Sequence, residues 1–128
     1  MGDQTYNNTD PGAYILAVLN GITSPTLSGT GNRALYSDPN GVITNTASDR
    51  SLKQDITPVD PFTALAQTLQ LKPVYWHWIN KRKFGYQREI GFVAQDVDEV
   101  ISEVVGENSD FTLSLDYSHS TAVLAGGM

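Results

Sequence analysis

The amino-acid composition of this 128-residue chain changes at Ser48, and the change restricts the folds that are open to the sequence. Residues 1–47 hold a single basic residue, Arg33, and are dense in Gly, Asn, Thr, Ser and Pro. The other basic residues and both tryptophans follow Ser48. We therefore predict two parts, a β-rich segment at residues 1–47 and a small mixed domain at residues 48–128.

Two turn sequences divide the first part. Residues 29–32 read Gly-Thr-Gly-Asn, and residues 38–41 read Asp-Pro-Asn-Gly. Asn and Gly tolerate positive φ angles and Pro presets the first bend of a turn, so both segments favour tight turns. We predict that short strands flank them.

A helix start is predicted in the second part. Asp60 followed by Pro61 is typical of an N-cap and a first helical position. Apolar residues then recur at three- and four-residue spacing, which predicts an amphipathic helix of about three turns, ending at Pro73. The apolar residues of this predicted helix are Phe62, Leu65 and Leu69.

Further elements follow along the chain. Residues 74–79 indicate a strand, residues 89–93 a return strand, and residues 80–85 the hairpin tip between them. Apolar residues at helical spacing from Ala94 to Val104 predict a second helix that ends near Gly106. These residues are Ala94, Val97, Ile101 and Val104.

The last elements complete an α+β fold. Residues 111–117 alternate between apolar and polar side chains, which predicts a half-buried strand. Ser118 is expected to cap a final short helix that runs through Leu124. The fold class that we predict is α+β, with short antiparallel strands and two or three short helices after the β-rich segment.

Composition excludes several kinds of function. The net charge of −6 argues against nucleic-acid binding, which needs a basic surface. The absence of cysteine excludes disulfides, zinc–thiolate sites and thiol catalysis. The longest apolar run is far shorter than a membrane span.

We expect no cofactor and no metal, and we interpret the carboxylates of the second helix as a solvated surface. They are Asp96, Asp98, Glu99 and Glu103.

The segment that joins the two parts holds a candidate catalytic pair. Ser48 is a hydroxyl nucleophile, and Lys53 is an amine five positions later. A lysine that is desolvated enough to be neutral can accept the serine proton as a general base. Spacing alone is weak support for this chemistry, because serine and lysine lie this close in many loops.

Three other residues are candidates for supporting roles. His77 could orient Lys53 or polarise a carbonyl, although a strand histidine between Trp76 and Trp78 is the commoner interpretation. Glu89 and Gln95 could donate or accept a hydrogen bond at the reaction centre, although surface polarity is the commoner interpretation for both.

Residues 48–53, Ser-Asp-Arg-Ser-Leu-Lys, resemble the cleavage motif of a known family. The family is the endosialidase-type intramolecular chaperone of phage tail spikes, tail fibres and neck appendages. Further similarity lies at residues 71–76, Leu-Lys-Pro-Val-Tyr-Trp, and at residues 90–97, Ile-Gly-Phe-Val-Ala-Gln-Asp-Val. Residues 115–117, Leu-Asp-Tyr, are also similar, and residues 31–38 resemble the shaft segment upstream of the cleavage site. Ser51 departs from the family, which commonly has arginine there.

The resemblance implies a mechanism and its residues. The domain would form a homotrimer, hold the N-terminal fibre or spike part of the same chain in register, and then cut itself free. Ser48 would be the nucleophile and Lys53 the base, with the cut between Ser48 and Asp49. A serine hydroxyl reaches the preceding carbonyl more easily than its own, so a cut between Ala47 and Ser48 is the alternative.

The resemblance also implies where the parts act. Residues 1–47 would be the C-terminal end of a β-structured shaft that stays in the virion, and residues 48–128 would be the released chaperone. Assembly would take place in the cytoplasm of the infected bacterial host, without nucleic acid or membrane as a partner. A hypothesis from another class is a trimeric structural cap that never cleaves, and the two hypotheses differ at Ser48 and Lys53.

Overall fold

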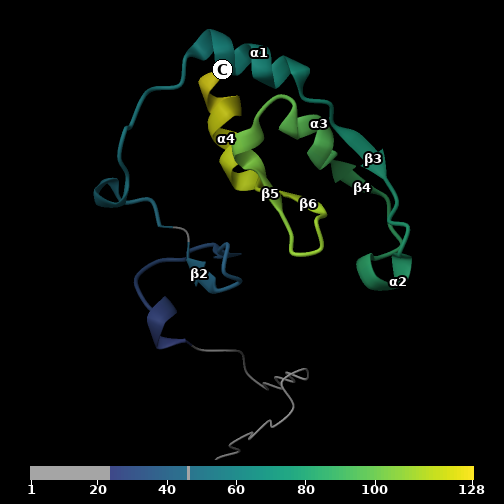
Figure 1. The fold of residues 1–128 in the computed structure, drawn as a ribbon, viewed down its shortest axis with the longest axis horizontal. Helices are drawn as coiled ribbons and strands as arrows, with labels where there is room; N and C mark the ends of the chain where they lie inside the picture. Colours follow the sequence, from purple (N-terminus) through teal and green to yellow (C-terminus); the bar gives the residue numbers. More distant parts are fainter. Residues whose placement is uncertain (1–23, 46) are drawn as a thin grey trace, which may run out of the picture. The chain divides into compact units, whose positions relative to one another are not determined.

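The computed structural model describes residues 24–45 and 47–128, which belong to two compact units divided between Gln54 and Asp55 (Figure 1). The part of the predicted β-rich segment at residues 1–23 lies outside the described residues, as does Thr46. The predicted boundary at residues 47 and 48 stays a prediction.

The first unit contains one of the predicted turns between two short strands. Strand β1 (Leu35–Ser37) pairs antiparallel with β2 (Ile43–Asn45). The Asp38 carboxylate accepts hydrogen bonds from the backbone N–H groups of Asn40 (2.8 Å) and Val42 (2.9 Å), and Gly41 has a φ of 78°. This strand–turn–strand arrangement is confirmed. Two single 3₁₀ turns, η1 (Pro25–Leu27) and η2 (Arg50–Leu52), flank the hairpin in the sequence.

In the second unit, helix α1 (Pro61–Gln70) begins as the sequence predicts. The Asp60 carboxylate accepts hydrogen bonds from the Thr63 backbone N–H (2.9 Å) and hydroxyl (2.8 Å), which occupies an otherwise unpaired donor of the first turn. These two hydrogen bonds lower the pKa of Asp60, because they favour the ionised carboxylate. The N-cap prediction is confirmed.

The face that α1 buries is not the predicted one. Ala64 is fully buried, whereas the side chains expected to face the core are 43 to 83% exposed. They are Phe62, Leu65 and Leu69. Helix α4 (Tyr117–Gly126) lies beside α1 and packs closely against Ala64, because a Cβ atom added at Gly126 would lie 3.1 Å from the Ala64 Cβ. The small side chains therefore face the neighbouring helix, and the large apolar ones face outward.

The hairpin predicted between residues 74 and 93 is present. Strand β3 (Val74–Trp76) pairs antiparallel with β4 (Glu89–Gly91), with Trp76 opposite Glu89. Its tip is a single helical turn, α2 (Lys81–Phe84), rather than an irregular loop (Figure 1). Asn80 caps this turn through the Lys83 N–H (3.2 Å), and Gly85 ends it at a φ of 114°.

The second predicted helix is shorter than expected. Helix α3 (Ala94–Asp98) ends two turns early, and the 3₁₀ turn η3 (Ser102–Val104) follows. The β-branched residues of this stretch disfavour a continuing helix. Three of the four predicted core residues are nonetheless fully buried. They are Val97, Ile101 and Val104, and half-buried Leu71, Phe92, Leu115 and Val123 pack against them.

The C-terminal segment differs from the prediction in its boundaries. Strand β5 (Val105–Glu107) was not predicted, and it pairs antiparallel with β6 (Leu113–Leu115). The predicted strand at residues 111–117 is shorter, because Phe111 has a φ of 68° and lies in the turn before β6. Helix α4 is capped by Asp116, not by the predicted Ser118.

The described part of the chain is thus α+β, with three antiparallel strand pairs and four α-helices rather than two or three. Within residues 24–45 and 47–128, no helix has both the length and the apolar character needed to cross a membrane.

Candidate functional site

The turn η2 brings Ser48 and Lys53 together. The Asp49 carboxylate accepts hydrogen bonds from the Ser51 backbone N–H (2.9 Å) and hydroxyl (2.6 Å), which caps the start of the turn. At its end, the Lys53 N–H donates to the Arg50 carbonyl oxygen (3.1 Å). The chain therefore bends back on itself between the two candidate residues.

The side chains of the pair are in direct contact. The Lys53 Nζ atom donates a hydrogen bond to the Ser48 Oγ atom at 2.8 Å, within the distance that proton transfer requires. Both side chains are exposed to solvent in the single chain. An exposed ammonium is well hydrated, whereas a lysine that acts as a base must lose that hydration. The single chain thus supplies the contact but not the desolvation.

Asp49 keeps its charge through the hydrogen bonds that form the cap. The Ser51 hydroxyl and then the Ser51 backbone N–H lower the pKa of the Asp49 carboxyl, because both bind its ionised form. Sequence reasoning treated Asp49 only as one side of the cut and missed this role. The signal was present, since an aspartate two residues before a serine favours this local turn.

The residues predicted to support the pair all belong to the second unit. His77 is exposed, and it lies between half-buried Trp76 and Trp78, whose rings meet edge to face at 5.7 Å. His77 lies just after β3, which ends at Trp76, so it is not the strand residue that the structural interpretation expects. Glu89 and Gln95 both line an open groove beside the β3–β4 hairpin. A contribution of these residues to catalysis stays a prediction.

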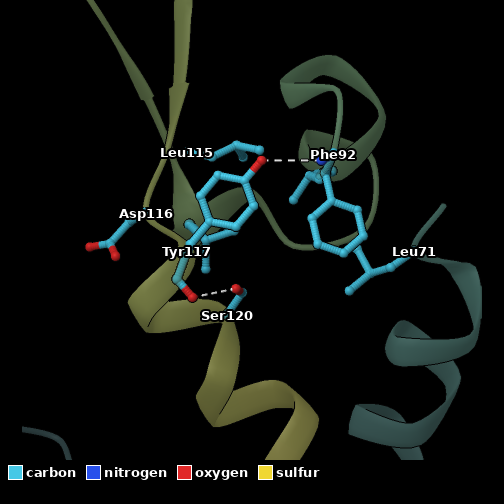
Figure 2. Close-up of a pocket in the computed structure, with 8 residues that line it drawn as sticks. Leu71, Phe92, Leu115, Asp116, Tyr117 and Ser120 are labelled. Atoms are coloured by element: carbon cyan, nitrogen blue, oxygen red, sulfur yellow. Dashed lines mark hydrogen bonds between the residues drawn. The ribbon is translucent and has the colours of Figure 1, made fainter. Parts of the chain in front are cut away.

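Tyr117 and half-buried Phe92 pack together at the edge of the buried core, around a small cavity (Figure 2). The Phe92 backbone N–H donates to the Tyr117 hydroxyl oxygen at 3.1 Å, and the two rings stack with centroids 6.1 Å apart. The cavity between them is only about 10 Å³, which is close to the lower limit for one water molecule. A Cβ atom added at Gly91 would lie 2.5 Å from the Tyr117 hydroxyl oxygen, so this close packing explains the glycine of the Ile-Gly-Phe-Val segment.

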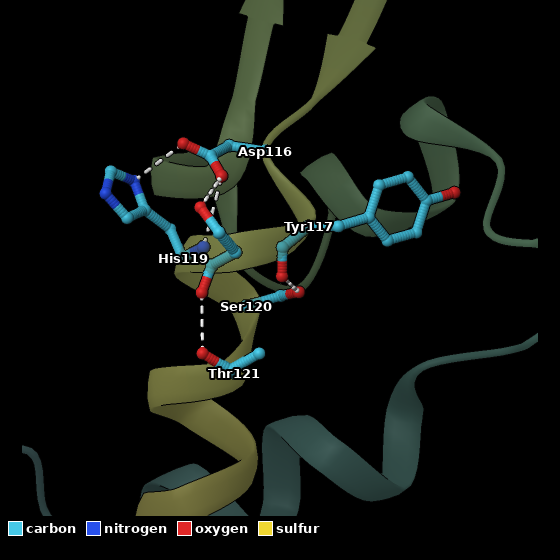
Figure 3. A network of polar contacts seen from close by, with 6 residues as sticks. Asp116, Tyr117, His119, Ser120 and Thr121 are labelled. Atoms are coloured by element: carbon cyan, nitrogen blue, oxygen red, sulfur yellow. Dashed lines mark hydrogen bonds and ion pairs between the residues drawn. The ribbon is translucent and has the colours of Figure 1, made fainter. Parts of the chain in front are cut away.

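Asp116, Ser118 and His119 form a second polar cluster that contains the residue types of a catalytic triad (Figure 3). Here the Ser118 hydroxyl donates to the Asp116 carboxylate, and the His119 N–H donates to the same oxygen at 3.1 Å. His119 Nδ1 lies 3.1 Å from the other carboxylate oxygen. The Ser118 hydrogen bond is the main cause that lowers the pKa of Asp116. Because the serine bonds to the aspartate and not to the histidine, the cluster caps α4 and does not activate a nucleophile.

Within residues 24–45 and 47–128, no group of three or more His, Asp or Glu side chains is placed to hold a metal ion.

These features define a class of protein. It is a small α+β domain that follows, in the sequence, a capped turn on which a serine and a lysine are in contact. The comparison with known families agrees, because residues 48–106 match the model of the family Peptidase S74, described as chaperone of endosialidase. The matched segment begins at Ser48 and includes Lys53. No curated protein matches the chain. Residues 48–106 are therefore similar to the endosialidase-chaperone family, and the name of that family indicates a serine peptidase.

Proposed function

We propose that this chain is an intramolecular chaperone that trimerises, folds a phage tail spike, fibre or appendage, and then releases itself by autoproteolysis. The partner that it folds is the N-terminal part of its own chain, of which residues 1–47 are the shaft end. Folding takes place in the cytoplasm of the infected bacterium, and the shaft goes on into the virion. One observation carries this proposal, the 2.8 Å contact of Lys53 Nζ with Ser48 Oγ at the start of the matched segment.

The proposed cleavage needs no cofactor, because Ser48, Lys53, the peptide bond and water account for every bond and proton. Neutral Lys53 takes the proton from the Ser48 hydroxyl, and Oγ attacks a peptide carbonyl carbon. The C–N bond breaks, the departing amine takes the proton from Lys53, and water then hydrolyses the ester. The first choice for the cut is the bond between Ser48 and Asp49. Attack on the Ala47 carbonyl closes a less strained ring, so the bond between Ala47 and Ser48 is the alternative.

Trimerisation is supported by how little of the single chain is buried. The hydrophobic residues that are fully buried in the described part number four, whereas Phe62, Leu69 and Phe111 are each more than 75% exposed. Large exposed apolar surfaces on a small domain mark interfaces with other chains. Three chains held together are also kept at high effective concentration and in register, which an intertwined β-shaft needs before its non-local contacts form. Release after folding then traps the shaft kinetically.

A trimeric cap that does not cleave is the second candidate. It is favoured by one observation, the exposure of Lys53 in the single chain, which leaves its ammonium hydrated. In the self-cleaving function, assembly has to remove that water.

Intact mass of the folded, assembled protein over time tests the proposal. We expect two fragments from the parent and none from Ser48→Ala, while Ser102→Ala, at an exposed serine of η3, is cut at the parent rate. A released fragment that begins at Asp49 supports the first bond, and one that begins at Ser48 supports the alternative. A parent that assembles but stays intact is the result expected of the non-cleaving cap.

A further inference from the structure

An open groove of about 500 Å³ runs between the β3–β4 hairpin and β6 in the second unit. Four of its eleven lining residues are aromatic, and they include both tryptophans of the chain. The aromatic lining residues are Trp76, Trp78, Phe92 and Tyr117. The faces of aromatic rings carry partial negative charge, so a groove of this kind attracts cations as well as apolar groups.

Glu89 adds a full negative charge to the groove. It lies directly opposite Trp76 in the strand register, and this places both side chains on the same face of the hairpin. Glu89 is half-buried, yet within residues 24–45 and 47–128 its carboxylate has no hydrogen bond and no ion pair. A carboxylate without a partner on the wall of a groove can form an ion pair with a cation that binds there.

Matching cations lie at the tip of the same hairpin. Lys81 and Arg82 are exposed on α2, and in the described part of the chain their side chains have neither an ion pair nor a ring contact. The two nearest basic residues are different, because Lys83 lies over the Phe84 ring at 4.9 Å and Arg88 over the Tyr75 ring at 4.2 Å. The hairpin therefore carries two unpaired cations on α2 at its tip, and an unpaired anion in the strand pair nearest the tip, Trp76 with Glu89.

We propose that the groove binds the Lys81–Arg82 tip of a second copy of this chain, with Glu89 as the ion-pair partner and the aromatic rings as the surrounding wall. The proposal rests on the assembly part of the proposed function and names the surfaces that make it. The charge complementarity selects this occupant. Because the tip and the groove are different surfaces of each copy, the contact is head-to-tail, and contacts of this type close into rings when the rotation allows.

Two charge-neutralised variants test the contact, each with a matched control. Lys81→Gln with Arg82→Gln removes the tip cations, and Lys72→Gln removes a cation elsewhere. Glu89→Gln removes the groove anion, and Glu103→Gln removes an exposed carboxylate on η3. Light scattering across a dilution series measures the dissociation constant of the assembly. We expect each contact variant to weaken assembly about tenfold or more, and neither control to change it. Tryptophan emission reports on the groove directly, so the parent's emission should change on dilution.

A charge-swap experiment provides a second test of the contact. Glu89→Arg alone should weaken assembly, and adding Lys81→Glu and Arg82→Glu to the same chain should restore it, because both halves of the contact are then reversed. Thermal melting of each variant confirms that the monomer fold is intact. If the parent assembles and Glu89→Gln and the tip variant dissociate at the same concentration as the parent, the groove contact is wrong and the proposed function stands. A parent that is monomeric at every concentration overturns the proposed trimer itself.

Discussion

Lys53 meets Ser48 because of hydrogen bonds made by the residues between them. The Asp49 carboxylate accepts twice from Ser51 and caps the single turn that brings the ends of residues 48–53 together. The contact is therefore a local property of the sequence. Removal of water from Lys53 is not local, and in the proposed function it depends on assembly.

Lys53→Arg is expected to abolish cleavage. The guanidinium reaches as far as the ammonium, but it stays protonated at any accessible pH and cannot accept the Ser48 proton. The exposed position makes a folding defect unexpected, which thermal melting can check. Intact mass after incubation measures the cut, with Lys72→Arg as the control that should cleave like the parent. Cleavage of Lys53→Arg at the parent rate would remove Lys53 from the mechanism.

Ser51→Ala is expected to raise the pKa of Asp49 toward its ordinary value. The Ser51 hydroxyl is the largest cause of the lowered pKa, and its removal leaves the backbone hydrogen bond alone. The pKa of Asp49 is lower in the folded chain than in the unfolded chain, so the cap contributes its full stability above the unfolded-state pKa. That stability is lost as the pH falls through the folded-state pKa. In Ser51→Ala the folded-state pKa is higher, so that loss should be complete at a higher pH than in the parent.

An NMR titration of the Asp49 carboxyl carbon measures this shift, in a Ser48→Ala background that keeps the chain intact. Asp60, whose cap hydrogen bonds come from Thr63, is the internal control and should titrate as in the parent. An Asp49 titration that Ser51→Ala leaves unchanged would show that the hydroxyl hydrogen bond does not form in solution.

At the scale of the elements, the sequence predicted features that depend on neighbouring residues. It did not predict features that depend on packing between residues far apart in the chain. The Asp60 cap was predictable because the aspartate, the proline and the first turn are adjacent. The buried face of α1 was not, because it is chosen by Gly126 of α4 and by Gly127 after it, more than fifty residues away. Strand β5 was missed because Val105-Gly106-Glu107 is too short to show alternation.

The same distinction between local and distant contacts applies to the candidate site and to the groove. Ser48 and Lys53 could be proposed from the sequence because their motif is contiguous and resembles that of a known family, and the structure shows their side chains in contact. The groove around Glu89 could not be, because it combines β3, β4 and β6, and no local pattern shows that these elements lie together.

Gly126→Val is expected to destabilise the packing of α1 against α4. Its new side chain would meet the Ala64 Cβ at 3.1 Å and the Val59 Cγ1 at 3.5 Å, in a place where the two helices leave no room. Overpacking of this kind typically costs about 1–3 kcal/mol. Chemical denaturation measures the change, and Ala122→Val, at an exposed position of the same helix, is the control. Equal stabilities of the two variants would mean that α4 does not pack against Ala64 in solution.

At the scale of the whole molecule, a small core coexists with a large apolar surface. The buried cluster of Val97, Ile101 and Val104 holds α3, η3 and the β5–β6 pair together. Most large apolar side chains of α1 and of the hairpin lie outside that cluster and are exposed. A domain of this kind gains much of its stability from other chains, so its melting temperature should rise with protein concentration.

Residues 49–128 are expected to fold as an autonomous unit without the β-rich segment. Their core cluster, the three helix caps at Asp60, Asn80 and Asp116, and the α1–α4 contact all lie within this fragment. None of these features uses a residue before Ser48. Circular dichroism during heating should therefore show a cooperative transition for the fragment, at a temperature close to that of the Ser48→Ala full chain at equal concentration. Gly126→Val within the fragment is the internal check and should lower that temperature. A fragment that melts without cooperativity would show that the chaperone domain needs the shaft end to fold, and the two-part organisation of the chain would then be wrong.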